Sequence, residues 1–259
     1  MNSRSTRRAH QLTAREAFRV VRSNVLVAIS ELANPVVVVT SASAGEGKTS
    51  VCVNLAESLA AAGSRVVVVD LDLRNPEAHR RFAAYNEIGV SDVLLGRATL
   101  DDSLQYIELP APDSDRSAGL SFLAAGAPVH DPTELLATPR TAQLLESLSS
   151  QADIVLLDTP PVLPVADTLV IGRLAAGAVL VVESRSTPGP AAKRAKDSLT
   201  RNQTRLLGVV LNKFDPDEAS YGIGEPNGYR VGNGLGSGFD REVAPTNGRG
   251  ARSGNGSGA

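Results

Sequence analysis

The stretch from Pro35 to Ala62 restricts the possible folds more than any other part of this chain. A short apolar strand, Val36–Val39, leads into a loop of small residues that ends Gly47-Lys48-Thr49 and opens a helix. This order matches the phosphate-binding loop, with an alanine at its first position where glycine is commoner. Small residues let backbone N–H groups turn toward phosphate oxygens, and the helix N-terminus adds a positive dipole. An ordinary glycine-containing turn does not need strand, loop and helix in this register, so the pattern predicts a nucleotide site.

Acidic residues follow two further strands of the type that is buried on both faces. The run RVVVVDLDLR ends in Asp70 and Asp72, and the run DIVLLD ends in Asp158. In open α/β sheets, ligands bind at the carboxyl ends of parallel strands, so these acids should meet the phosphate loop at one edge. A lone Asp after a strand is usually a helix cap or a turn former. Three acids beside a phosphate loop would repel one another unless a cation lay among them, which favours a Mg²⁺–nucleotide cluster.

Strand and helix patterns alternate along most of the chain. We expect strands at residues 35–40, 65–71, 120–124, 153–158, 177–182 and 206–212, and helices at 14–32, 49–62, 132–149, 166–176 and 188–202. Alternation of this kind is typical of one α/β domain with a parallel sheet. The predicted fold class is therefore a P-loop NTPase, with a mostly parallel, doubly wound sheet and helices on both faces.

Composition narrows the class of protein further. The net charge of −2 gives no electrostatic footprint for nucleic acid. The single cysteine, Cys52, falls in the helix after the phosphate loop and is expected to be a core residue in a reducing compartment. No apolar run approaches the roughly 20 residues that span a bilayer, and no signal-peptide pattern occurs. We therefore expect a cytoplasmic chain.

Three segments are expected. Residues 1–13 are basic and polar without an apolar period, and predict a flexible arm; residues 14–214 are expected to form the P-loop domain. Residues 215–259 are rich in Gly, Asn and Ser and should be disordered, because they hold too few apolar residues to offset ordering. This tail contains Tyr221 and Tyr229, two of only four tyrosines. A tyrosine in such a tail adds no fold stability, so these hydroxyls are candidates for a chemical role; the alternative is that they are chance aromatics or weakly adhesive side chains.

With these residues in hand, the chain resembles the bacterial tyrosine kinases, the autokinases of capsular and extracellular polysaccharide export. The resemblance covers roughly residues 14–215, and the order and spacing of its motifs are more specific than any one of them. The motifs are, in chain order, Glu16-x-x-Arg19-x-x-Arg22, the phosphate loop, Asp70-x-Asp72-x-Arg74-x-Pro76, Gly89-Val-Ser-Asp92, Gly126-Ala-Pro128, Pro132-Thr-Glu134, Asp158-Thr-Pro-Pro161 with Asp167 downstream, and Gly208-Val-Val-Leu-Asn212.

The resemblance implies a role for each motif. Asp70, Asp72 and Lys48 would be catalytic, with Asp70 accepting the tyrosine proton, although Asp70 and Asp72 can exchange roles. Arg74 is expected to brace the acidic cluster. Thr49, Asp72 and Asp158 would hold Mg²⁺. Nucleotide binding is expected from Ala44, Gly45, Glu46, Gly47, Lys48, Thr49, Ser50 and Asn212, with Asn212 facing the adenine.

The resemblance also implies partners. The helix that carries Glu16, Arg19 and Arg22 would build a homo-oligomeric ring, although a solvated face with an internal Glu16–Arg19 pair explains the same pattern. Tyr221 and Tyr229 would accept phosphate in trans. A transmembrane activator of the chain-length-determinant type would recruit the chain to the inner face of the cell membrane, and a tyrosine phosphatase is expected to reverse the modification. ATP and Mg²⁺ are the expected substrate and cofactor.

The chain departs from the family pattern at two places. It has two tail tyrosines instead of a cluster, and it reads Pro128-Val-His-Asp-Pro132 where the family has Pro-Pro-Asn-Pro.

Two alternative functions remain open on sequence alone. The first is a positioning or partition ATPase that acts as a switch, which shares the fold and the carboxylate strands. Those relatives carry a signature lysine five residues before the loop lysine, where this chain has Ser43. The second alternative is a regulator that binds ATP and has lost phosphoryl transfer.

Overall fold

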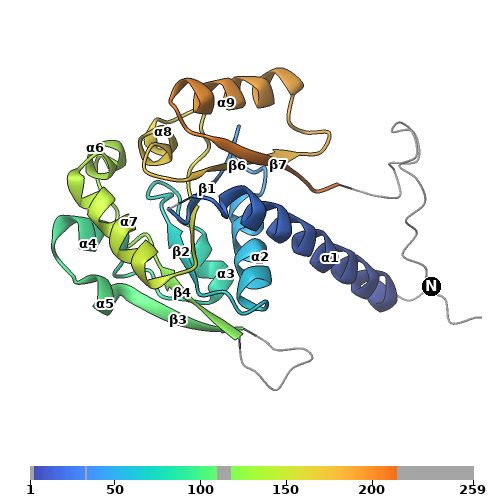
Figure 1. The fold of residues 1–259 in the computed structure, drawn as a ribbon, viewed down its shortest axis with the longest axis horizontal. Helices are drawn as coiled ribbons and strands as arrows, with labels where there is room; N and C mark the ends of the chain where they lie inside the picture. Colours follow the sequence, from blue (N-terminus) through green and yellow to red (C-terminus); the bar gives the residue numbers. More distant parts are fainter. Residues whose placement is uncertain (1–2, 33, 110–117, 215–259) are drawn as a thin grey trace, which may run out of the picture. The chain divides into compact units, whose positions relative to one another are not determined.

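The computed structural model describes residues 3–32, 34–109 and 118–214 of the chain. Its centre is a seven-stranded sheet in the order β3-β4-β2-β5-β1-β6-β7 (Figure 1). All neighbouring strands are parallel except the edge pair β3 and β4. The strands are β1 (Val36–Ser41), β2 (Val66–Asp70), β3 (Leu104–Leu109), β4 (Ala118–Leu123), β5 (Ile154–Asp158), β6 (Gly177–Glu183) and β7 (Leu206–Asn212). This arrangement confirms the predicted fold class.

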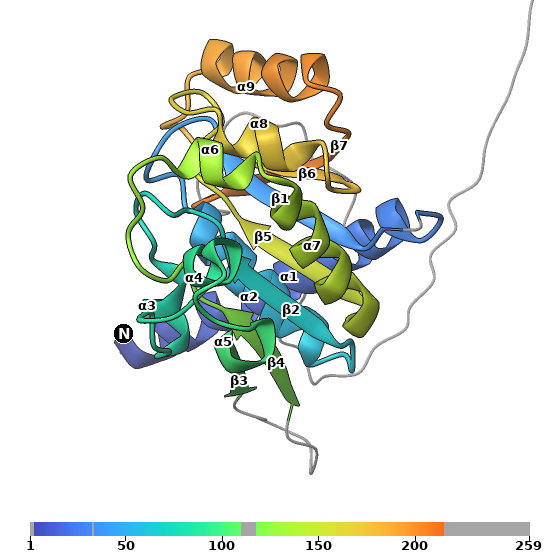
Figure 2. The same cartoon turned by 90° about the vertical axis from the view of Figure 1, so that its left-hand side faces the viewer.

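Helices cover both faces of the sheet, because its central strands are apolar on both sides. The helices are α1 (Ser3–Ile29), α2 (Lys48–Ala60), α3 (Ala78–Phe82), α4 (Val90–Leu95), α5 (Leu100–Ser103), α6 (Pro132–Leu136), α7 (Pro139–Gln151), α8 (Asp167–Gly172) and α9 (Gly189–Arg201). One core layer joins the sheet to α1, α2 and α3, and the other joins it to α4, α6, α7, α8 and α9 (Figure 2). Cys52 is a fully buried free thiol of the first layer, as expected.

Three elements differ from the sequence-based expectations. Helix α1 begins at Ser3, so residues 3–13 continue the helix instead of forming a flexible arm; no glycine or proline precedes Pro35 to interrupt it. The helix expected over 132–149 is two helices, because Pro139 cannot continue α6 and instead opens α7. The edge strand β3 was not expected, since its exposures alternate and give no continuous apolar run.

The described residues end at Phe214, which is also the end of the first compact unit of the chain. The predicted disordered tail over residues 215–259 lies outside the described residues. None of the helices in the described ranges is long and apolar enough to cross a membrane.

Candidate nucleotide and phosphoryl-transfer site

The phosphate loop connects the buried strand β1 to α2, as the sequence predicts. Gly47 is the residue before the helix and adopts φ 91°, a left-handed conformation that favours glycine. A Cβ atom on Gly47 would lie 2.1 Å from the Asn212 amide nitrogen, so the position also has no room for a side chain. The Asn212 amide donates to the Glu46 carbonyl (2.9 Å). Strand β7 therefore delivers Asn212 to the phosphate loop, where a nucleotide-binding residue is expected.

Glu46 takes part in this loop in a way that the sequence did not indicate. Its carboxylate is buried and accepts the backbone N–H groups of Ala42 (2.8 Å) and Ser43 (3.2 Å). The other carboxylate oxygen accepts the Thr187 hydroxyl (2.7 Å). The Glu46 side chain therefore fixes the shape of the loop and points into the protein, which leaves only its backbone to face a phosphate. The other expected binding residues, Ala44, Gly45 and Ser50, lie along the loop and in the first turn of α2.

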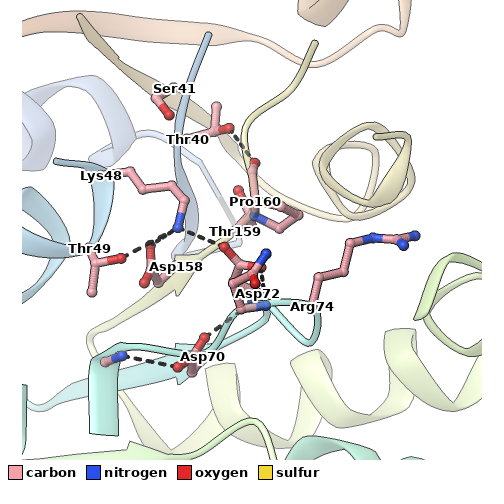
Figure 3. Close-up of polar contacts among 12 residues, drawn as sticks. Thr40, Ser41, Lys48, Thr49, Asp70, Asp72, Arg74, Asp158, Thr159 and Pro160 are labelled. Atoms are coloured by element: carbon pink, nitrogen blue, oxygen red, sulfur yellow. Dashed lines mark hydrogen bonds and ion pairs between the residues drawn. The ribbon is translucent and has the colours of Figure 1, made fainter. Parts of the chain in front are cut away.

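Lys48 lies between two of the predicted acids (Figure 3). Its ammonium nitrogen is 2.8 Å from an oxygen of Asp72 and 3.8 Å from an oxygen of Asp158. The Lys48 ammonium also donates to the Thr49 hydroxyl (3.4 Å). The ends of β2, β5 and the phosphate loop thus bring together the residues that the sequence assigns to catalysis and to Mg²⁺.

Burial and charge act against each other on these groups. Burial raises the pKa of Asp158 to about 6, although Lys48 and Thr49 lower it. Burial by itself lowers the pKa of Lys48, but the attraction of Asp158 and Asp72 outweighs burial and leaves the pKa raised. Lys48 therefore stays protonated at neutral pH, which suits a residue that neutralises phosphate charge.

Asp70 occupies a different environment from Asp72. It is fully buried, and its two oxygens accept the backbone N–H groups of Asp72 (3.2 Å) and Ala78 (3.1 Å). Figure 3 shows both of these hydrogen bonds as dashed lines. Burial, and then the charge of Asp158, raises the pKa of Asp70 well above its usual range. Asp70 thus holds the loop that presents Asp72 and the start of α3.

Arg74 leaves the acidic cluster instead of bracing it directly. Its guanidinium forms a two-bond ion pair with the fully buried Asp167 (2.7 and 3.1 Å) and also donates to the Thr133 hydroxyl (3.0 Å). Thr133 in turn donates to Asp167. Arg74 therefore ties the loop after β2 to α6 and α8. Sequence analysis places Asp167 downstream of β5 but gives no signal for this pairing.

A second contact that the sequence did not indicate closes the loop from the side of β7. The Lys213 ammonium donates to the Gly45 carbonyl (2.9 Å) and pairs with Glu183 (2.9 Å). Lys213 directly follows Asn212, so the same turn makes both contacts with the phosphate loop.

The residues at this site fit Mg²⁺ in the presence of a nucleotide. Both oxygens of Asp158 are buried without a hydrogen-bond partner in the described part of the chain, and Thr49 lies beside them. Within the described ranges, no three His, Cys, Asp or Glu residues gather in a metal-binding group. Mg²⁺ usually keeps several waters and takes one or two carboxylates together with substrate phosphates. Asp158 and Thr49 are therefore suitable oxygen ligands, although side chains alone do not form a cage.

The predicted oligomerisation residues do not share one environment on α1. Glu16 and Arg19 form an exposed pair (2.8 Å), which is the internal pair that the sequence allowed. Arg22 instead donates to the Ser58 carbonyl of α2 (2.8 Å) in the same chain. Tyr221 and Tyr229 lie outside the described residues, whereas Tyr85 and Tyr106 are 76% and 67% exposed.

Comparison with known proteins agrees with this geometry. Residues 37–223 match the sequence model of the CobQ/CobB/MinD/ParA nucleotide binding domain, a class of P-loop proteins. YwqD, a tyrosine-protein kinase of Bacillus subtilis, is 34% identical over 197 residues, which are 76% of this chain and 80% of YwqD. The chain therefore belongs to the bacterial tyrosine kinases within the CobQ/CobB/MinD/ParA nucleotide-binding family.

Two further likenesses support the assignment. The solved kinase domain of the Escherichia coli tyrosine kinase Etk superimposes with a TM-score of 0.71 at 30% identity, over 77% of this chain and 75% of that one. EpsB of Ralstonia solanacearum is 36% identical over 217 residues, which are 83% of this chain but 28% of EpsB. The chain thus spans little more than a quarter of EpsB.

Proposed function

We propose that the chain is an ATP-dependent protein-tyrosine autokinase that phosphorylates Tyr221 and Tyr229 in trans and thereby regulates capsular or extracellular polysaccharide synthesis and export. The observation that carries the proposal is the placement of Lys48 between Asp72 and Asp158, at the end of the parallel strands and beside the phosphate loop. The family of named tyrosine kinases to which the chain belongs supplies the reaction.

Phosphoryl transfer depends on positioning and charge neutralisation more than on covalent chemistry. Backbone N–H groups of the loop from Ala44 to Thr49 would bind the β- and γ-phosphates, and Lys48 would neutralise the charge that develops on them. The buried Glu46 carboxylate keeps the loop in shape. Asn212 would face the adenine, although its present hydrogen bond to the Glu46 carbonyl also supports the loop.

When bound, Mg²⁺ would offset negative charge on the phosphates. Thr49, Asp72 and Asp158 would hold it directly or through water. The unpartnered oxygens of Asp158 support this assignment most, since a buried carboxylate without a hydrogen bond costs free energy unless a cation approaches it.

The tyrosine hydroxyl has a pKa of about 10 and gains from a nearby carboxylate that takes its proton. The sequence favours Asp70 for this role but allows Asp72. The oxygens of Asp70 accept the backbone N–H groups of Asp72 and Ala78, and those of Asp72 accept the Lys48 ammonium and the Asn75 N–H, so both carboxylates are engaged. We therefore propose Asp70 as the proton acceptor, as the family resemblance implies, with Asp72 as the alternative.

The partners follow from the family resemblance. We propose a ring of copies assembled through α1, a transmembrane activator of the chain-length-determinant type, recruitment to the inner face of the cell membrane and a tyrosine phosphatase. Phosphate adds roughly −1.5 to −2 charges per tyrosine, which would repel the tail from an acidic site and loosen the ring.

The second candidate function is the positioning or partition switch ATPase, because the matched nucleotide-binding family includes MinD and ParA. Ser43 stands where such ATPases carry a signature lysine, and this argues for the kinase.

Phosphotyrosine formation by the purified chain with ATP and Mg²⁺, with and without the cytoplasmic end of a candidate activator, tests the proposal. We expect Lys48→Ala to lower the signal on the order of a hundredfold, because it removes a cation that stabilises the transferred phosphate. The double substitution Tyr221→Phe/Tyr229→Phe should abolish the signal but keep ATP binding. Tyr85→Phe/Tyr106→Phe, which changes the chain's other two tyrosines, is the matched control and should keep the signal.

Loss of signal with Lys48→Ala but not with the tail variant would contradict the proposed acceptors. Steady ATP hydrolysis without any phosphotyrosine, even with the activator, would contradict the kinase and support the switch ATPase.

A further inference from the structure

The outer surface of α9 carries positive charge that the nucleotide chemistry does not use. Four basic side chains of this helix are exposed: Lys193, Arg194, Lys196 and Arg201. We call these four residues the α9 basic face. The apolar side of the helix is already buried against the sheet through Ala191, Ala195 and Leu199. Only the polar side of α9 is therefore available to a partner.

In the part of the chain that the structure describes, no acidic side chain pairs with the α9 basic face. None of its four residues forms an ion pair with another residue in the described ranges. The acid nearest along α9 is Asp197, and the only other acid between residues 173 and 205 is Glu183, which pairs with Lys213. This segment holds seven basic residues and two acidic ones, whereas the whole chain has a net charge of −2. Positive charge is thus locally in excess here, as it also is over residues 1–22, which hold six basic residues and one acidic one.

Two further arginines, one after α8 and one between α9 and β7, lie next to two residues that pack against each other. Gly172 packs so closely on Thr204 that a Cβ atom would lie 2.4 Å from its hydroxyl. Arg173 and Arg205 directly follow these two packed residues, and both are exposed. In both ribbon views, α9 is the outermost element at the β6 and β7 edge of the sheet (Figures 1 and 2). A broad surface could approach it without meeting another helix.

We infer that the α9 basic face binds the surface of an anionic lipid bilayer. Basic side chains near such a surface are attracted by its negative potential. Because the apolar residues Ala191, Ala195 and Leu199 of α9 are already buried, the binding rests on charge and should be reversible and weakened by salt. The inference goes beyond the proposed kinase activity, since it gives the domain a membrane contact of its own that does not require the activator.

The charge distribution favours a bilayer over the two other polyanionic partners. A duplex nucleic acid is usually bound by a chain or domain with a clear basic excess, and this chain has a net charge of −2. A second copy of the chain would have to offer an acidic surface that matches the α9 basic face. A bilayer needs only a local group of exposed positive charges, and α9 provides this.

Sedimentation of the full chain with vesicles tests the inference. The vesicles contain phosphatidylglycerol with phosphatidylcholine, or phosphatidylcholine alone. We expect binding to the anionic vesicles only, at about 0.1 M salt, and its loss near 1 M salt, where the Debye length falls to about 3 Å. Lys193→Gln/Arg194→Gln/Lys196→Gln should lower the partition coefficient by at least about tenfold. Circular dichroism and ATP binding check that this variant is folded.

The matched control removes the same charge elsewhere. Arg80, Arg81 and Arg97 are exposed, and they lie on α3 and after α4, next to β2 and β4 and away from α9. Arg80→Gln/Arg81→Gln/Arg97→Gln should bind vesicles as the unchanged chain does. An equal loss of vesicle binding in both triple variants would show that binding depends only on net charge, and would overturn the inference. So would the absence of binding to anionic vesicles, or preferential binding of a DNA duplex or of a second copy through α9.

Discussion

Asp158 ends β5 with both carboxylate oxygens buried and without a hydrogen-bond partner in the described part of the chain. Lys48 is the charge that opposes it, at 3.8 Å. Burial of an ionised carboxylate costs free energy unless it is well paired. The pKa of Asp158, raised to about 6, expresses that cost. At the residue scale, the buried carboxylate makes this site less stable than an apolar core would be, and strongly shifted pKa values of this kind cluster at functional sites.

The raised pKa makes a prediction about stability and pH. Between the ordinary pKa of an aspartate, about 3.9, and about 6, the unfolded chain ionises Asp158 while the folded chain keeps it protonated. The stability that this group contributes is thus complete below pH 4 and is lost as the pH rises through 6. We expect Asp158→Asn to raise the free energy of unfolding at pH 7 by about 3 kcal/mol, with little change at pH 4. Urea unfolding without nucleotide measures it.

Asp153→Asn is the matched control for this prediction. Asp153 accepts hydrogen bonds from Arg65, which lower its pKa, so its contribution has the opposite sign and is lost as the pH falls. Asp153→Asn should therefore never stabilise the chain. An Asp158→Asn variant that is less stable than the unchanged chain at pH 7 would contradict the assignment of Asp158 as a strained carboxylate.

At the scale of helices and strands, two arginine–aspartate ion pairs join elements but differ in burial. Arg74 and Asp167 join the loop after β2 to α8, while Arg65 and Asp153 join the starts of β2 and β5. Both have a shortest contact of 2.7 Å, but Asp167 is fully buried and Asp153 is about half exposed. We expect Arg74→Ala to lower the free energy of unfolding by about 2 kcal/mol, because it leaves a buried carboxylate with only the Thr133 hydroxyl. It should also weaken ATP binding, since Asp72 is two residues away.

Arg65→Ala is the comparison, because exposed ion pairs contribute little to stability. Arg74→Lys should recover only part of the loss, since an ammonium cannot form both hydrogen bonds of the guanidinium. Urea unfolding and nucleotide titration measure both effects. Equal losses of stability for Arg74→Ala and Arg65→Ala would show that Arg74 does not tie the elements together.

The sequence predicts well those elements whose buried residues follow one another without interruption in the chain. The valine runs before Asp70 and Asp158 indicate central parallel strands, and the phosphate loop indicates the start of α2. The edge strand β3 was not predicted, because its residues are only partly buried and give no continuous apolar run. It pairs with β4, which follows it in the chain. The contacts of Glu46 with Thr187 and of Arg74 with Asp167 join positions 141 and 93 residues apart, so no local pattern reports them.

At the scale of the whole molecule, the topology explains why the site could be predicted although its contacts could not. Strands β1, β2 and β5 are neighbours and parallel, so the residues that follow them must meet at one edge. That rule places Lys48, Asp72 and Asp158 together before any side-chain position is known. It does not decide which acid faces the ammonium, because that depends on the backbone hydrogen bonds that turn Asp70 toward α3.

The ring of copies proposed to assemble through α1 can be tested with variants of the exposed Glu16–Arg19 pair. The exposed pair of Glu16 and Arg19 makes no contact that the fold needs, whereas Arg22 binds α2 of its own chain. We expect Glu16→Ala/Arg19→Ala to reduce the assembly to monomers in light scattering while the melting temperature of the monomer stays unchanged. Arg22→Ala should lower the melting temperature as well, because it removes a contact between α1 and α2.

As a control, Arg65→Ala/Asp153→Ala removes another exposed pair and should leave the assembly intact. An unchanged assembly in Glu16→Ala/Arg19→Ala would leave that pair as a solvated feature of α1 and place the contact between copies elsewhere.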